Sequence, residues 1–372
     1  MDQTTSPSFT VEYIESPPAA EPMPDEFATH RVRRSVLILA AVVLAVVVVV
    51  TLLPGLGSVR NTFKGARPGW LVAAGALQLL SCLSYVLVFR GVFCRVMRWV
   101  TSYEIATAEL AANSLLSVGG AGGLALGAWI LRRGGLAGAE IARRTVAFFL
   151  LTSVANFVAA IVVGIALAIG LLDSNLSPAA GLVPAAGAAA VMALVPLARP
   201  AATRLARRSQ HRRLSAALES VAGGVDEAIV LLRSRSLLVL GGSFGYMLFD
   251  VASLWVCFKA FGLPLPAGGV VLLAYLIGQL GGLIPIPGGI GGIDGGLIGT
   301  LVLYGIGATQ ATVAVLAYRA LALWLPLALG VPSMVSLRRR LRREEHDIKA
   351  CAPGDEVDVI GRGRVPAAAL GR

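Results

Sequence analysis

The chain has 372 residues, of which 56% are hydrophobic and only 14% are charged. So few charged groups cannot cover a soluble fold this apolar, and several uncharged runs approach or exceed the roughly 18 residues that span hydrocarbon. The composition excludes an ordinary soluble protein and indicates an integral membrane protein. The net charge of +11 is carried by short basic clusters between apolar runs, as in cytoplasmic membrane loops, so no nucleic-acid partner is expected.

The first 34 residues are predicted to form a disordered cytoplasmic tail. Positions 1–29 contain six acids, five prolines and no Lys or Arg, a composition that cannot bury enough apolar surface to order itself. Arg31, Arg33 and Arg34 then lead directly into an apolar run, without the short core and cleavage site of a secretory signal. This run is therefore predicted to be an uncleaved first span.

Apolar runs of spanning length recur along the chain. The predicted spanning helices are 35–53, 69–89, 145–172, 179–198, 236–261 and 311–337. Two further apolar stretches, 104–131 and 267–306, differ because they are dense in the helix breakers Gly and Pro. The sequence SVGGAGG occupies 117–123, and PIPGGIGGIDGG occupies 285–296.

The distribution of Lys and Arg among the loops decides between two topologies, since basic loops stay cytoplasmic. If the N-terminus is inside and both broken stretches are re-entrant hairpins, 24 basic residues lie inside and 3 outside. If each broken stretch crosses once, 12 lie inside and 15 outside. The re-entrant topology is predicted, with both termini cytoplasmic and the protein in the cell membrane.

The two glycine breaks, at 119–123 and 288–292, are 169 residues apart. A shift of 169 residues places the span at 69–89 within the span at 236–261. The same shift fits the first span, 35–53, less well. Each half reads span, span, broken hairpin, span, and three crossings per half give the two halves opposite orientations. Paired broken segments in an inverted repeat indicate a transporter binding site near the membrane midplane.

The predicted fold is therefore an all-α polytopic membrane protein, with six transmembrane helices and two re-entrant helical hairpins in an inverted repeat. The first membrane repeat is assigned to 35–172 and the second to 173–337. Within the second, 199–235 is predicted to be a basic amphipathic cytoplasmic loop that attracts anionic lipid headgroups, although its charge also serves to enforce topology. Residues 338–372 are predicted to be a basic and then polar cytoplasmic tail.

The sequence from 285 to 299, PIPGGIGGIDGGLIG, is followed by Ala317, Tyr318 and Arg319 and by Trp324, Leu325 and Pro326. These residues resemble the lysylphosphatidylglycerol synthase transmembrane family, the flippase-type membrane regions of multiple peptide resistance factors and their stand-alone relatives. The resemblance covers roughly residues 35–340 and implies a role with anionic phospholipids. Bifunctional members carry an aminoacyltransferase domain after this region, and residues 338–372 are too short for one, so lysyl transfer is not expected.

Ionisable side chains inside apolar runs are the candidate site residues, because a charge at the bilayer centre costs about 2.5–3.5 kcal/mol on insertion scales. The leading hypothesis is that Arg319 seeks a phosphate, that Asp294 orients it, and that exposed amides of the second hairpin complete the anion site. The hairpin residues assigned to this site are Pro287, Gly288, Gly289, Gly291 and Gly292. The alternative is a buried ion pair that only pins the hairpin to the last helix.

Three further residues have both a structural and a functional interpretation. Asp250 is either an interhelical hydrogen-bonding group, the favoured interpretation, or a proton-coupling carboxylate. Glu109 and Asn113 lie four residues apart before the first glycine break, where they satisfy broken backbone groups or form a cytoplasmic counterpart of the site. The GxxxG spacings, including Gly278/Gly282 and Gly295/Gly299, are interpreted as helix-packing positions.

Cysteine and histidine do not indicate metal or redox chemistry. The scattered Cys82, Cys94, Cys257 and Cys351 predict neither a disulfide framework nor a metal site, and no catalytic histidine is indicated. We therefore expect no cofactor, no metal and no enzyme activity. The expected function is a flippase or transporter of an anionic phospholipid or lipid-linked phosphate. The alternatives are an intramembrane enzyme or accessory subunit of lipid or cell-envelope metabolism, and a non-transporting scaffold; homo-oligomer formation is left open.

Overall fold

The computed structural model describes residues 57–115, 121–172, 176–209, 211–283 and 289–349, together with positions 37, 40, 41 and 351. In these residues all regular secondary structure is helical. The helices long and apolar enough to cross a membrane are α3 (Pro68–Phe93), α6 (Gly138–Ala168), α7 (Pro178–Arg208), α9 (Leu237–Ala260) and the Ala308–Leu337 part of α12 (Ala308–Lys349). They correspond to five of the predicted spans. The other, 35–53, lies outside the described residues except for three helical positions.

Both glycine-rich stretches are divided into shorter helices, as their composition predicts. The first contains α4 (Trp99–Leu115) and α5 (Ala121–Arg133), and the second contains α10 (Gly268–Gly278), the 3₁₀ helix η3 (Gln279–Leu283) and α11 (Gly292–Leu303). At 1.5 Å per residue, α10 and α11 are each about 17 Å long, well short of the roughly 30 Å of a hydrocarbon core. Neither crosses a bilayer alone.

The break before α11 depends on glycine. Gly289 and Gly291 have φ angles of +65° and +88°, in the left-handed region that other residues rarely adopt. The carboxylate of Asp294 then accepts a hydrogen bond from the Gly291 N–H at 2.8 Å. This contact satisfies an amide that the start of α11 leaves unpaired.

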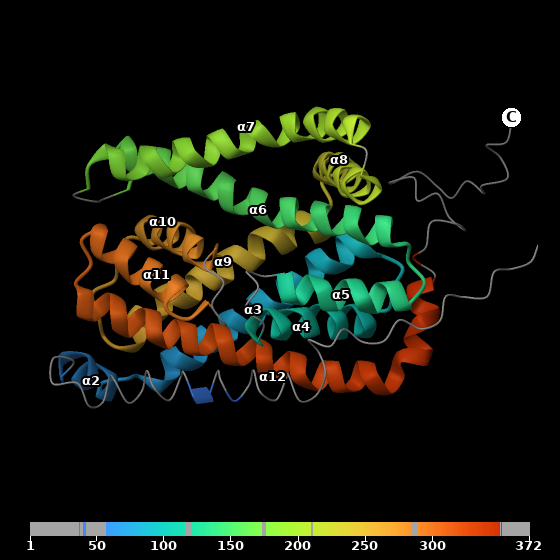
Figure 1. The fold of residues 1–372 in the computed structure, drawn as a ribbon. Helices are drawn as coiled ribbons and strands as arrows, with labels where there is room; N and C mark the ends of the chain where they lie inside the picture. Colours follow the sequence, from blue (N-terminus) through green and yellow to red (C-terminus); the bar gives the residue numbers. More distant parts are fainter. Residues whose placement is uncertain are drawn as a thin grey trace, which may run out of the picture.

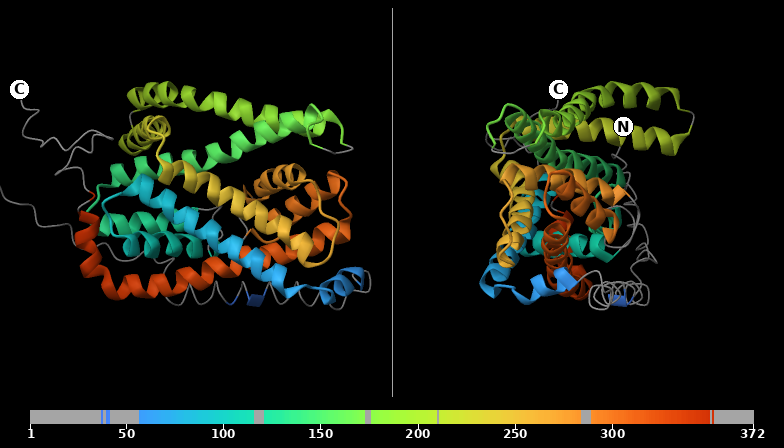
Figure 2. Two further views of the ribbon diagram at one scale, coloured as in Figure 1. Left: turned by 180° about the vertical axis from the view of Figure 1, so that it is seen from behind. Right: turned by 90° about the vertical axis from the view of Figure 1, so that its left-hand side faces the viewer.

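The helices form a bundle around a central pair (Figures 1 and 2). Helices α3 and α9 pack against each other along much of their lengths. The α4/α5 pair lies at one end of the bundle and the α10/α11 pair at the other. Helices α6, α7 and α8 (Arg212–Arg233) cover one side, and α12 runs along the opposite side. The short α2 (Gly57–Lys64) precedes α3.

Helix bounds repeat with the spacing found in the sequence. Helix α3 begins at Pro68 and α9 at Leu237, 169 residues later, and α4 and α10 begin at Trp99 and Gly268 with the same offset. Helices α6 and α12 begin 170 residues apart, at Gly138 and Ala308. The order of long helix, broken pair and long helix therefore occurs twice in the described chain.

Small residues allow the closest helix approaches, but not at every predicted position. A Cβ built at Gly281 would overlap the carbonyl oxygen of Gly292, and one at Gly296 would lie 2.7 Å from the carbonyl oxygen of Gly278. In contrast, Cβ atoms at Gly295 and Gly299 would meet nothing within 4 Å. Within the described part of the chain, the interpretation of the Gly295/Gly299 spacing as a packing motif is therefore not confirmed, because that face of α11 has no close described neighbour.

Three features of the basic segments differ from the sequence-based prediction. Helix α7 continues to Arg208, so only Arg212–Arg233 forms the separate helix α8 within 199–235. Helix α12 continues past the predicted boundary at 337 to Lys349, where Ile348 is buried against Gly134. Cys94 and Cys351 form a disulfide, which their isolated positions did not predict because the fold joins residues 257 apart in sequence.

An ion network fastens α8 to the rest of the bundle. The buried Glu140 on α6 accepts hydrogen bonds from Arg143 and Arg144, and Arg143 also pairs with Glu227 of α8 at 3.1 Å. Arg144 donates a further hydrogen bond to the Phe93 carbonyl oxygen at the end of α3. Burial raises the pKa of Glu227 above its ordinary value, and the nearby arginines oppose this rise.

Replacing Glu140 with glutamine is expected to lower the stability of the protein. The change leaves two arginines without their shared carboxylate, and hydrogen bonds to charged groups are each worth about 1.5–3 kcal/mol. We expect a lower melting temperature in detergent, measured by the loss of the monodisperse peak after heating. The control is Glu219→Gln, because Glu219 is exposed on α8 and, among the described residues, is bonded to Ser215 in the same helix. An equal loss in both variants would contradict a role for the network.

Candidate functional site

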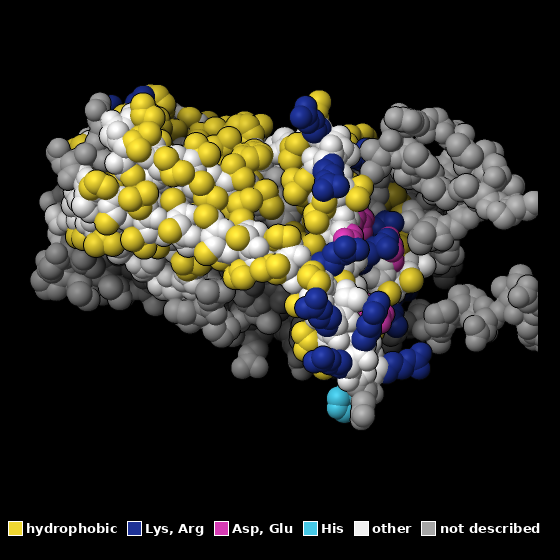
Figure 3. Space-filling view, turned by 90° about the horizontal axis from the view of Figure 1, so that it is seen from above, with side chains coloured by type: hydrophobic (Ala, Val, Ile, Leu, Met, Phe, Trp, Pro, Cys, Tyr) yellow, Lys and Arg dark blue, Asp and Glu magenta, His cyan; other side chains and the backbone are white. Residues whose placement is uncertain are grey.

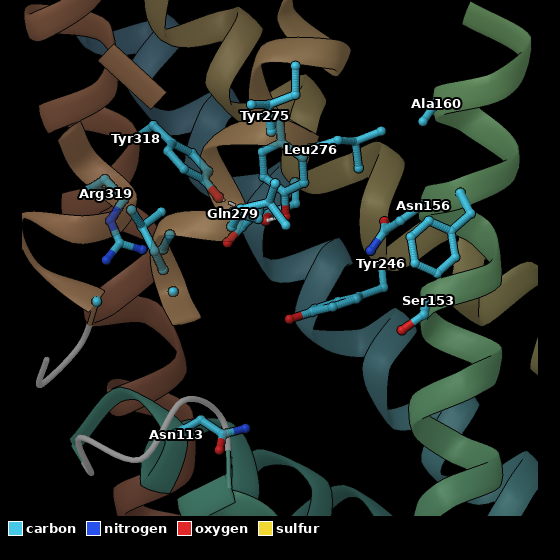
Figure 4. A pocket seen from close by; sticks show the side chains of 18 of the residues that line it. Asn113, Ser153, Asn156, Ala160, Tyr246, Tyr275, Leu276, Gln279, Tyr318 and Arg319 are labelled. Carbon is cyan, nitrogen blue, oxygen red and sulfur yellow. Dashed lines mark hydrogen bonds between the residues drawn. The ribbon is translucent and has the colours of Figure 1, made fainter. Parts of the chain in front are cut away.

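A cavity of about 750 Å³ lies inside the bundle between the two broken helix pairs. Asn113 and Ser114 line it from the end of α4, and Gln279, Gly289 and Ile293 line it from the second pair. Figure 4 shows Tyr318 and Arg319 on one wall, with Ser153 and Asn156 of α6 on the opposite wall. The two stretches singled out by their glycines therefore contribute to a single cavity.

Arg319 lines the cavity from α12 and is paired with Asp294 of α11. Arg319 Nε donates to Asp294 Oδ1 at 2.6 Å, and both side chains are 15% exposed. Since Asp294 also holds the Gly291 amide, one carboxylate connects the hairpin turn with the guanidinium. The arrangement directs a cation toward the cavity and keeps it beside the left-handed turn, as Arg319 Nη2 lies 3.5 Å from a Cβ built at Gly289.

Asp250 lies in the cavity wall formed by α9, where it is 6% exposed. Its Oδ2 accepts hydrogen bonds from the hydroxyl groups of Tyr275, on α10, and Tyr318, on α12, at 2.5 and 2.8 Å. A single carboxyl group thus joins three helices, which is the interhelical role that the sequence favoured. The hydroxyl group of Tyr246, one turn earlier on α9, points into the open space of the cavity.

The two candidate residues of the first pair have different positions. Glu109 is buried, accepts a hydrogen bond from the Tyr85 hydroxyl at 3.0 Å and lies against Gly127, and it is not among the described lining residues. Asn113 does line the cavity, and its Oδ1 accepts a hydrogen bond from the Gly123 N–H at 2.7 Å. Asn113 therefore satisfies a broken backbone group of α5, while its side chain remains next to the cavity.

The hairpin residues of the predicted site fall into three groups. Pro287 and Gly288 lie outside the described residues. Gly289 lines the cavity. Gly291 gives its amide to Asp294, and the Gly292 carbonyl oxygen faces Gly281. The hypothesis of free hairpin amides therefore needs correction at Gly291, because an internal carboxylate already occupies that donor.

Sequence reasoning missed most of the uncharged polar lining. It did not propose Gln78, Ser153, Asn156, Tyr246, Tyr275 or Tyr318 as site residues, although all of them line the cavity. The available signal was an amide, hydroxyl or phenol inside an apolar span. That signal is weak by itself, because such side chains also hydrogen-bond their own helix. Only the rotation of each helix in the bundle directs them to a common cavity.

Helix α7 forms an apolar wall opposite Arg319. Pro184, Gly187, Ala188 and Val191 line the cavity from this helix. Helix α7 packs mainly on α6 and α8, with a smaller contact to α10. Only 17% of the most apolar stretch of α7 is buried against the rest of the chain. The cavity therefore has a polar wall, with the cation, the carboxyl group and the tyrosines, and an apolar wall formed by α7, while Ser153 and Asn156 add polar groups from α6. Within the described ranges, no three His, Cys, Asp or Glu side chains form a group that could hold a metal ion.

The helical bundle defines this chain as a polytopic integral membrane protein. Residues 37–330 match the family described as the lysylphosphatidylglycerol synthase TM region. The match covers most of the chain, so the chain belongs to this family, and the resemblance seen in the sequence is confirmed. Asn113, Asp250, Asp294 and Arg319 all lie within the matched range. No curated protein matches the chain.

Proposed function

We propose that this protein binds an anionic phospholipid or lipid-linked phosphate in the central cavity and carries it between leaflets of the membrane. The observation that carries the proposal is the amphipathic cavity, with Arg319 as the basic residue among its described lining residues. A guanidinium has five N–H donors in a planar fork and suits the oxygens of a phosphate. Asp294 holds the Nε side of this group and so orients it.

The shape of the cavity supports a lipid in preference to a free anion. A headgroup fits the polar side formed by α9, α10 and α12, where Tyr275, Tyr318 and Arg319 lie. Its acyl chains leave along the apolar wall of α7, which includes Ala188 and Val191. Because α7 makes few contacts with the α10/α11 pair, this wall is the proposed route by which a lipid enters from the bilayer.

We further propose that α4/α5 and α10/α11 are re-entrant hairpins of an inverted repeat. Three observations support this arrangement. Helices α5, α10 and α11 are too short to cross the bilayer, the two pairs lie at opposite ends of the bundle, and the helix bounds recur at the same offset. Each hairpin then brings its turn toward the midplane from its own side. Rocking of the halves about the α3/α9 contact would expose the cavity alternately to the two leaflets.

The basic end of the bundle is assigned to the cytoplasm, with the cell membrane as the location. Figure 3 shows apolar side chains over most of one face and Lys and Arg gathered at the end where α8 lies. The exposed Arg204, Arg207, Arg212 and Arg213 belong to this end. Their distribution follows the preference of basic loops for the cytoplasm.

The Cys94–Cys351 disulfide lies at this basic end and tests the cytoplasmic assignment, because disulfides rarely persist in a reducing cytoplasm. Protein purified without reductant and then denatured is expected to react with maleimide at two thiols, Cys82 and Cys257, and at four after reduction. Mass spectrometry of the labelled protein measures this number. In protein isolated from cells under acidic quenching, four reactive thiols without reductant would support the cytoplasmic assignment, and two would contradict it.

Reconstitution tests the proposed function directly. Purified protein in phosphatidylcholine vesicles with a trace of fluorescent phosphatidylglycerol is expected to expose inner-leaflet lipid to an external quencher over time. Vesicles without protein and a fluorescent phosphatidylcholine trace are the controls. Chemical conversion of the labelled lipid would favour an enzyme, and neither exchange nor conversion would favour a scaffold.

A further inference from the structure

The charge balance of the cavity is unusual for an anion site. Asp250 and Arg319 are the residues of charged type among its described lining residues, and Arg319 is already paired with Asp294. If all three groups are ionised, they carry a net charge of −1, which repels an entering anion. A proton on Asp250 removes this repulsion, because a neutral carboxyl group has no net charge to oppose the phosphate.

Polar or titratable groups interact with the Asp250 carboxyl group from four helices, α3, α9, α10 and α12. They are Gln78 and Cys82 on α3, Tyr246 on α9, Tyr275 on α10, and Tyr318 and Arg319 on α12. The two tyrosine hydroxyls hold Oδ2, and Arg319, the cation that acts on Asp250 through its charge, donates its Nε to Asp294. A buried carboxylate whose neighbouring cation is shared with a second carboxylate is costly to keep ionised.

Two buried acceptor oxygens on residues that line the cavity lack a donor among the described residues. They are Oδ1 of Asp250 and Oε1 of Gln78. A proton bound to Asp250 turns Oδ1 from a buried acceptor without a described donor into a donor itself. Buried polar groups are rarely left unsatisfied, so this arrangement favours a bound proton.

Consecutive residues of α12 contact Asp250 and Asp294. Tyr318 donates to Asp250, and the next residue, Arg319, donates to Asp294. A phosphate that binds at Arg319 therefore lies in the same cavity as Asp250 and shifts its proton equilibrium. By thermodynamic linkage, the proton must shift anion affinity by the same factor.

We propose that Asp250 is a proton-binding site of the cavity, and that one proton binds there together with each anionic headgroup held by Arg319. No covalent bond other than the O–H bond of the carboxyl group forms or breaks; the proton comes from water and returns to it. The inference rests on the proposed function and adds proton co-binding to it. It predicts anion affinity that weakens as pH rises through the range in which free Asp250 ionises.

The experiment measures binding of dihexanoyl phosphatidylglycerol to the full chain in an uncharged maltoside detergent. Its phosphodiester does not titrate between pH 5 and 8, so protons taken up on binding belong to the protein. Calorimetry in buffers of different ionisation enthalpy is expected to report uptake approaching one proton per lipid. In that range, affinity is expected to fall about tenfold for each pH unit, as linkage to one proton requires.

Asp250→Asn is the informative variant, because its amide places an N–H donor where the proposed proton lies. It is expected to bind the lipid without proton uptake and with an affinity independent of pH. Asp250→Glu restores an ionisable group and is expected to restore the pH dependence. The matched control is Glu104→Gln on α4, a buried carboxyl group bonded to the Ser336 hydroxyl and outside the described cavity lining, which should keep wild-type proton uptake.

The outcomes separate the two proposals. Lipid binding without proton uptake in the wild type would overturn the inference and leave the proposed function intact. Undiminished uptake in Asp250→Asn would overturn the assignment to this residue. If the wild type binds no dihexanoyl phosphatidylglycerol at any pH in this range, both the anion site and the proton site are contradicted.

Discussion

Replacing Arg319 with lysine or alanine is expected to reduce exchange of phosphatidylglycerol between leaflets by about 10- to 100-fold. The estimate corresponds to loss of a charge-assisted hydrogen bond to phosphate, worth about 1.5–3 kcal/mol. Lysine retains the charge but lacks the planar fork, so it is not expected to compensate fully. The measurement is the rate at which inner-leaflet fluorescent lipid becomes accessible in reconstituted vesicles, at equal amounts of inserted protein.

A paired variant distinguishes binding from simple pinning of the hairpin. Arg319→Ala removes the partner of the Asp294 carboxylate from a partly buried ion pair, and the loss of that partner destabilises the protein by itself. The double variant Asp294→Asn with Arg319→Gln removes both charges and keeps two side chains able to hydrogen-bond. It should recover thermal stability but not lipid exchange. Recovery of both properties would show that the pair only holds α11 against α12, and Arg207→Ala serves as the control for loss of a basic residue outside the cavity.

Gly281→Ala is expected to give the largest loss of stability among single methyl additions in the second helix pair. The new Cβ would overlap the Gly292 carbonyl oxygen, which belongs to the backbone and cannot rotate away. Overpacking of this kind typically costs about 1–3 kcal/mol. We expect a lower melting temperature in detergent, and a lower rate of lipid exchange because η3 and α11 must separate beside the cavity.

The matched control is Gly295→Ala, in the same helix pair. A Cβ at Gly295 meets nothing within 4 Å, and this position lies inside α11. Alanine is expected to be neutral there or to stabilise the helix by up to about 1 kcal/mol, since it has less backbone freedom to lose than glycine. If the two variants melt at the same temperature, the close approach of η3 and α11 does not contribute to stability.

Much of the helix arrangement along the chain could be predicted from the residues themselves. The spans at 69–89, 145–172, 179–198, 236–261 and 311–337 correspond to long helices, because hydrophobicity over a window of about 18 residues is a local property. The two glycine-rich stretches are divided into shorter helices for a similarly local reason, as left-handed φ angles at Gly289 and Gly291 illustrate. Family membership was also visible in a short segment around these glycines.

The candidate site was predicted at its charged residues, at Asn113 and at Gly289, but not at its tyrosines. Asp294 and Arg319 attracted attention because an ionisable group in an apolar run is costly, and they are in contact. The tyrosines around Asp250 carry no such cost and were not singled out as site residues. The hairpin amide at Gly291 was predicted to be open, and Asp294 occupies it, since the sequence does not show where a short side chain turns.

The amino-acid sequence by itself determined the membrane class, the long helices and the points where glycine interrupts them, because those properties depend on residues within one or two helical turns. Only the tertiary structure decided which glycines pack, which helices wall the cavity, and that Cys94 meets Cys351. These outcomes depend on how each helix is rotated against neighbours distant in sequence. A difference of one residue turns a side chain by about 100°, from the cavity to the lipid.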